Sequence, residues 1–219
     1  MKINFLGDSI TAGAWLTSPN DKYTVLLCEK LGATENNYGI SATRIARQTK
    51  PSEDRSFDQD FLSRMDSLDE TADFTFVFGG TNDYGHGDAP MGSAEDKTPY
   101  TFYGAMNIMT EYLVGKFGKY RLCYILPLPR FDEDNRRGGH SCKPSEANTL
   151  EEYREAIRKT AGKYGVDVLD LSDMFPRPKA QAADELTADG LHPNAKGHKL
   201  IADRLYEYLT KKLNLPAND

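Results

Sequence analysis

Hydrophobic residues along this chain alternate between short continuous runs and patterns with helical spacing. The short runs lie at residues 2–6, 73–78, 120–126 and 166–171, and the more polar stretch at residues 33–38 is a fifth, weaker candidate. Most of them are rich in aromatic and β-branched side chains and end at Gly or Pro, which is typical of strands buried within a sheet. We therefore expect five strands, of which the one at 33–38 has the weakest pattern.

Apolar residues with helical spacing lie between these runs, and most of the helical patterns begin at a residue able to cap a first turn. The expected caps are Ser18, Ser41, Thr98, Thr149 and Asn194. Strands that alternate with helices predict a parallel sheet covered on both faces. We expect a single α/β domain over residues 1–219, a three-layer α/β/α sandwich with a central parallel five-stranded sheet.

Composition limits the classes of partner. The net charge is −6 and the basic residues are spread along the chain, so neither nucleic acid nor an anionic membrane surface is an expected partner. No apolar run approaches the ~20 residues that a membrane span needs. The oligomeric state is left open by the sequence.

Cysteine use and the N-terminus bear on location. Cys28, Cys123 and Cys142 are odd in number and widely spaced, without a paired metal-ligand motif. The first expected strand begins at residue 2, and no signal-peptide pattern precedes it. These features predict a cytoplasmic protein.

Polar turns that contain glycine follow three of the expected strands. They place Ser9 after the first strand, Gly39 after the second and Asn82 after the third. The carboxyl ends of parallel strands lie at one edge of the sheet, where open α/β folds bind their ligands. These three residues are therefore expected to converge.

Asp189 and His192 lie in the loop after the last expected strand. An Asp three residues before a His can bind Nδ1 of the ring, which leaves Nε2 free to accept the proton of a serine. The weakly nucleophilic hydroxyl of Ser9 needs such a base. Oxyanion donors would be the N–H groups of Ser9 and Gly39 and the side-chain amide of Asn82.

Read in order, four blocks of this sequence resemble those of the SGNH (GDSL-type) hydrolase family. They are Gly7-Asp8-Ser9, Asn37-Tyr38-Gly39-Ile40-Ser41, Gly80-Thr81-Asn82-Asp83 and Asp189-Gly190-Leu191-His192-Pro193. Each block alone is weakly specific, but the ordered set, each block after an expected strand, is strongly specific. The first block departs slightly, with Ile10 where the family name has Leu.

The resemblance implies a flavodoxin-like α/β/α sandwich that hydrolyses esters or thioesters. No cofactor is expected. It implies Ser9 as nucleophile, His192 as base and Asp189 as the residue that orients His192. It also implies an oxyanion hole made by Ser9, Gly39 and Asn82.

Structural alternatives exist for the other polar residues. Asp8 is expected to hold the turn by hydrogen bonds, and His198 to be a packed or solvated helix residue. His86 and His140 lie in long loops, at about residues 84–97 and 130–148, and are expected to be exposed. No third ligand accompanies His86 and Asp88, so no metal site is expected.

The two long loops are polar and carry few long aliphatic residues. A lipase would show a broader apolar mouth. The favoured interpretation is a serine esterase that removes a short acyl group, such as acetyl, from a polar alcohol such as a carbohydrate. The alternatives are a lysophospholipase or acyl-thioesterase, and a non-catalytic glycan-binding module on the same scaffold.

Overall fold

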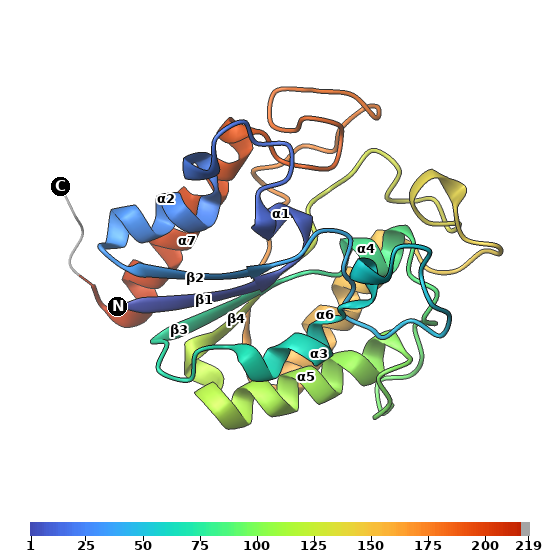
Figure 1. The fold of residues 1–219 in the computed structure, drawn as a ribbon, viewed down its shortest axis with the longest axis horizontal. Helices are drawn as coiled ribbons and strands as arrows, with labels where there is room; N and C mark the ends of the chain where they lie inside the picture. Colours follow the sequence, from blue (N-terminus) through green and yellow to red (C-terminus); the bar gives the residue numbers. More distant parts are fainter. Residues whose placement is uncertain (216–219) are drawn as a thin grey trace.

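The computed structural model describes residues 1–215 and builds them around a parallel five-stranded sheet (Figure 1). The strands are β1 (Lys2–Gly7), β2 (Thr34–Gly39), β3 (Phe74–Phe78), β4 (Leu122–Ile125) and β5 (Asp167–Leu169). Their order in the sheet is β2-β1-β3-β4-β5, and all four pairings are parallel. The predicted α/β/α architecture with a central parallel sheet is confirmed.

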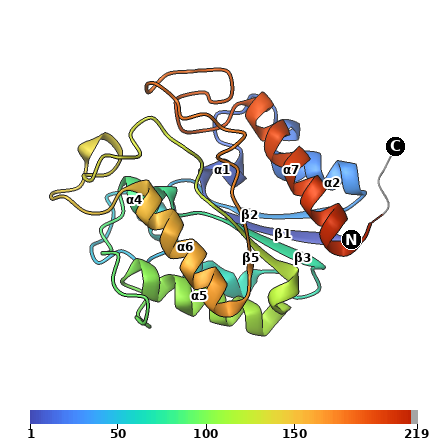
Figure 2. The same cartoon turned by 180° about the vertical axis from the view of Figure 1, so that it is seen from behind.

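Helices cover both faces of the sheet (Figures 1 and 2). The α-helices are α1 (Ser9–Ala12), α2 (Tyr23–Leu31), α3 (Phe61–Arg64), α4 (Thr81–Gly85), α5 (Phe102–Phe117), α6 (Leu150–Tyr164) and α7 (Ala195–Leu213). Short 3₁₀ turns lie at Pro19–Asp21, Arg55–Asp58, Met65–Ser67, Lys119–Arg121 and Gly139–Ser141. Helices α2 and α7 pack on one face, and α3, α5 and α6 on the other. No helix within residues 1–215 is both long enough and apolar enough to cross a bilayer.

The alternation of side chains along the strands divides the core into two clusters. In β3, Phe74, Phe76 and Phe78 pack toward α2 and α7, whereas Val77 packs toward α5 and α6. Each of these side chains is at most 2% exposed, and burying one contributes about 1.5–3 kcal/mol. Because both faces of the strand are buried, its sequence is almost continuously apolar.

The helix starts agree with the sequence at two of the five expected caps. Thr149 and Glu152 form the predicted reciprocal capping box, and Asn194 accepts hydrogen bonds from the first turn of α7. Helix α5 begins at Phe102 with Thr101 as its cap, so the prediction at Thr98 is displaced by one turn. Ser18 caps only a 3₁₀ turn, and no helix follows Ser41.

Strand order places the site. The chain leaves β1 for α2 on one face and leaves β3 for α5 on the other. A crevice therefore opens between the carboxyl ends of these adjacent strands, at the switch point where doubly wound sheets bind ligands. The short helices α1 and α4 begin directly after β1 and β3, and they line this crevice with Ser9 and Asn82.

His198 is a core residue of α7, fully buried between α7 and α2. Its Nδ1 accepts a hydrogen bond from the Tyr23 N–H at 3.2 Å, and its ring stacks on that of Tyr23. Its Nε2 has no hydrogen-bond partner among the described residues. Burial, with a smaller contribution from the charge of His192, lowers the pKa of His198 to about 4.

Acidification is expected to destabilise the protein through His198. The imidazole gains a proton near pH 6.5 in the unfolded chain but only near pH 4 in the folded protein. Between these pH values protonation therefore favours the unfolded state, so the stability present above pH 6.5 is lost progressively below it. The free energy of unfolding should fall by about 3 kcal/mol between these values. Urea unfolding of the wild type and His198→Phe at pH 7, 6, 5 and 4 measures the difference. Equal pH slopes would contradict this role.

Candidate active site

The turn after β1 fixes the Ser9 hydroxyl at the edge of the sheet. Asp8 caps α1 by accepting a hydrogen bond from the Ile10 N–H at 3.0 Å. Any side chain at Gly7 would collide with Thr11, since a Cβ there would lie 2.0 Å from Oγ1. Ser9 therefore follows a turn with little freedom. Its residual exposure is 6%, and the hydroxyl lines a cavity.

Ser9 and His192 meet although they are 183 residues apart. The Ser9 Oγ lies 2.9 Å from His192 Nε2, and His192 Nδ1 lies 2.8 Å from Asp189 Oδ2. Burial alone would raise the pKa of the Asp189 carboxyl, but hydrogen bonds from the backbone and ring of His192 hold it below its usual range. An ionised carboxylate only accepts, so Nδ1 carries the proton and Nε2 is left to accept the proton of Ser9.

The loop that carries this pair is held by its own backbone. Asp189 Oδ1 accepts hydrogen bonds from the N–H groups of Leu191 and His192, at 3.0 and 2.7 Å. The Ala188 N–H donates to the His192 carbonyl at 2.8 Å. These bonds form a tight turn in which the carboxylate and the imidazole lie side by side, as the spacing of the motif predicts.

Asn82 lies at the start of α4 and faces the same cavity. Its Nδ2 donates one hydrogen bond to the Thr43 carbonyl at 2.9 Å. A side-chain amide has two N–H groups, so this bond orients the side chain and leaves a second donor. The structure therefore brings Asn82 to the position that the sequence predicts.

Gly39 does not fit its predicted role. Its N–H donates to Asn37 Oδ1 at 2.9 Å, and Gly39 does not line the cavity. A Cβ at this position would lie 2.4 Å from the Ala12 backbone nitrogen. Glycine is needed here because the end of β2 packs closely on α1, and its N–H is already used. The structure thus contradicts the prediction that Gly39 is an oxyanion donor.

The sequence reasoning missed Ala42, which lines the cavity with a left-handed backbone at φ 61°. Its N–H makes no hydrogen bond within residues 1–215. A non-glycine residue in this conformation costs roughly 1–2 kcal/mol, and such strain gathers at functional sites. Glycine or asparagine would have marked the turn in the sequence, but alanine carries no such signal.

Buried charged groups hold the backbone around Ala42. Asp83 accepts hydrogen bonds from the N–H groups of Ile45 and Ala46, at 2.9 and 2.8 Å, and Arg64 donates to Thr43 Oγ1 at 2.8 Å. Burial raises the pKa of Asp83 to about 6 despite these bonds. At neutral pH the carboxylate is ionised and ties this loop to α4, so that Ala42 and Asn82 are positioned together.

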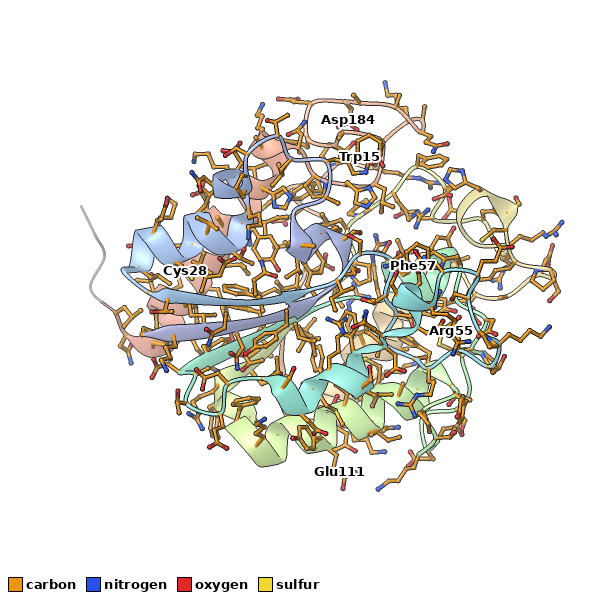
Figure 3. All side chains as sticks on the ribbon, in the orientation of Figure 1. Trp15, Cys28, Arg55, Phe57, Glu111 and Asp184 are labelled. Carbon is orange, nitrogen blue, oxygen red and sulfur yellow. The ribbon has the colours of Figure 1, made fainter. Side chains whose placement is uncertain are left out.

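The cavity has a volume of about 500 Å³ and opens at the carboxyl edge of the sheet. One part of its wall comes from the loop after α1, which carries Trp15 (Figure 3). Trp15 is 65% exposed, and its ring centroid lies 6.2 Å from that of His192. Further lining residues are His86, Arg130 and His140. His86 and His140 are exposed, as expected, but both face the site rather than open surface.

The loop between β4 and α6 packs on α4. Lys143, only 7% exposed, donates from Nζ to the Asp83 carbonyl at 2.9 Å and to the Tyr153 hydroxyl at 3.2 Å. The Cys142 thiol lies 2.9 Å from the Gly85 carbonyl oxygen. These contacts hold the loop in place as one wall of the cavity.

In the part of the chain that the structure describes, no three His, Cys, Asp or Glu side chains gather where they could hold a metal ion.

Comparison of the sequence with models of known protein families gives a match over most of the chain. The model of the GDSL-like lipase/acylhydrolase family matches residues 5–200. Among curated proteins, none matches this chain.

Solved structures with the same fold are numerous. A protein from Lactobacillus plantarum is 29% identical, with a TM-score of 0.78 and 96% of each chain covered. A lipase/acylhydrolase from Enterococcus faecalis is 19% identical, with a TM-score of 0.67, and the match covers 100% of this chain and 98% of that one. A member of the lipolytic protein G-D-S-L family from Veillonella parvula is 20% identical, with a TM-score of 0.63, covering 96% and 99%. The last two likenesses show a shared fold.

Proposed function

The chain belongs to the GDSL-like lipase/acylhydrolase family, and from this premise we propose that it is a serine esterase working through an acyl-enzyme on Ser9. Family membership implies an enzyme that hydrolyses esters. The observation that supports the serine mechanism is the hydrogen-bonded chain Ser9–His192–Asp189. Its Ser9–His192 bond is 2.9 Å long, its His192–Asp189 bond is 2.8 Å long, and Ser9 and His192 line the cavity.

In the first half-reaction, His192 Nε2 takes the proton of Ser9 while Oγ forms a bond to the carbonyl carbon. The ionised Asp189 stabilises the imidazolium. The tetrahedral intermediate then collapses, the bond to the alcohol oxygen breaks, and His192 returns its proton to the leaving alcohol. In the second half-reaction, water attacks the acyl-enzyme by the same route and releases the acid and Ser9.

The oxyanion would be bound by the N–H groups of Ser9 and Ala42 and by the Asn82 amide. Ser9 begins α1, and the first N–H groups of a helix have no partner within the helix. The Ala42 N–H is likewise without a partner among the described residues. Each such donor contributes about 3 kcal/mol to the transition state. Ala42 thus replaces Gly39 in this proposal.

We propose a short acyl group on a polar alcohol, such as an acetylated carbohydrate, as the substrate. The cavity wall includes the small residues Ala14, Ala42 and Gly85, and His86 and Ser41 add polar atoms to it. The Trp15 ring supplies an aromatic face of the kind on which a sugar ring can stack.

A panel of p-nitrophenyl esters with acyl chains from acetyl to palmitoyl tests this proposal. We expect kcat/KM to peak at acetyl or butyryl, because many of the residues that line the cavity are polar or small. A peak at long chains would instead indicate a lysophospholipase or acyl-thioesterase. Absence of hydrolysis at every length would favour a binding module.

A further inference from the structure

His86 brings a titratable side chain into the cavity that the proposed mechanism leaves unused. It follows α4 directly, four residues after Asn82, and lines the cavity together with Ser9 and His192. The proton on its imidazole decides whether the ring donates or accepts toward a substrate. The neighbouring side chain settles this point.

Arg44 fixes the tautomer of His86. Its Nη1 lies 3.0 Å from His86 Nδ1. A guanidinium has N–H donors and no acceptor, so Nδ1 must accept and carries no proton. The proton of the neutral ring is therefore on Nε2. A doubly protonated ring would place an N–H against an N–H.

Arg44 cannot turn away easily, because its other nitrogen is fully engaged. The side chain is 4% exposed, and Nη2 donates to Ser52 Oγ at 2.9 Å, to the Phe57 carbonyl at 3.0 Å and to Asp58 Oδ1 at 3.2 Å. The guanidinium is thus held by the 3₁₀ turn at Arg55–Asp58 and the segment before it. It is a positioning residue that holds the ring in one protonation state.

The Nε2–H group of His86 has no hydrogen-bond partner within the described chain. A neutral N–H donor that shares the cavity with Ser9 and is bonded to none of the described residues is suited to a substrate oxygen. We propose that His86 is a specificity-determining residue that donates a hydrogen bond from Nε2 to a hydroxyl oxygen in the alcohol part of the substrate, which makes a hydroxylated alcohol the preferred leaving group. This inference rests on the proposed function, and the substrate feature that His86 would recognise is a hydroxyl in the alcohol part.

Two acetate esters of matched ring size test the inference. A mono-O-acetylated methyl xyloside carries hydroxyls beside the ester, and cyclohexyl acetate has none. We expect the wild type to favour the glycoside. In His86→Phe, the ratio of the two kcat/KM values should fall about tenfold, the effect of losing one hydrogen bond of about 1.4 kcal/mol. His86→Gln keeps an acceptor for Arg44 and a donor for substrate, so it should restore part of the ratio.

An unchanged ratio in His86→Phe would overturn the inference and leave the esterase proposal standing. A second measurement does not depend on turnover: side-chain ¹⁵N NMR of the Ser9→Ala protein at pH 7. It should show His86 protonated on Nε2, with that resonance shifting when the acetylated xyloside is added. Protonation on Nδ1, or no shift of the Nε2 resonance at saturating xyloside, would refute the inference. Hydrolysis of neither ester by the wild type would instead count against the proposed function, and the NMR result would still decide the inference.

Discussion

Replacing Ser9 by alanine is expected to lower kcat/KM for p-nitrophenyl acetate by about 10⁴- to 10⁶-fold, as in other enzymes that use a serine nucleophile. The reason is that Oγ forms the bond to the acyl carbon, and no other hydroxyl of the described residues is hydrogen-bonded to His192 Nε2. The residual rate would reflect the oxyanion donors and substrate binding alone. Initial rates at several substrate concentrations give the comparison.

The fold should survive this change. Ser9→Ala removes one hydroxyl whose side chain bonds only His192 among the described residues, so the thermal midpoint should shift little. Ser172→Ala, an exposed serine in the loop after β5 and outside the cavity, is the matched control and should keep full activity. If Ser9→Ala retained more than a few per cent of the wild-type rate, the nucleophile would have to be another group.

Asp189→Asn is expected to lower kcat by about 10⁴-fold with little loss of stability. The asparagine Oδ1 can still accept from the N–H groups of Leu191 and His192, so the turn should persist. Its amide nitrogen, however, would donate to His192 Nδ1 and drive the proton to Nε2. The ring would then present an N–H to Ser9 and could no longer act as a base.

Asp184→Asn provides a matched control in the same loop. Asp184 Oδ1 also accepts two backbone N–H bonds, from Leu186 and Thr187 at 2.8 and 2.7 Å, but within residues 1–215 it has no histidine partner. Its variant should keep wild-type activity.

Much of the fold follows from local pattern. The aromatic run of β3 and the capping box of α6 are strong signals, and both elements lie where expected. Helices α1 and α4 have four and five residues, too few for a helical period to appear. The segment after Ser41 is buried but irregular, because Asp83 binds its N–H groups in place of a helical ladder.

The site was predictable where motifs fix the geometry and unpredictable where distant side chains decide it. Strand order and the Asp-x-x-His spacing bring Ser9, Asp189 and His192 together. The Gly39 N–H looked available in the sequence, but Asn37 occupies it. The N–H group of Ala42 is without a partner among the described residues, and an alanine in the sequence gives no sign of the left-handed backbone that Ala42 adopts. The state of His86 depends on Arg44, 42 residues away in sequence.

Labelling with a fluorophosphonate measures the nucleophile directly, without knowledge of the natural substrate. Only a serine that is activated by a neighbouring base and faces an oxyanion site reacts rapidly with this reagent. Intact mass spectrometry followed by peptide mapping should find a single adduct on Ser9, absent from Ser9→Ala and much slower to form in Asp189→Asn. An adduct on another residue, or none in a preparation that still hydrolyses p-nitrophenyl acetate, would contradict the account.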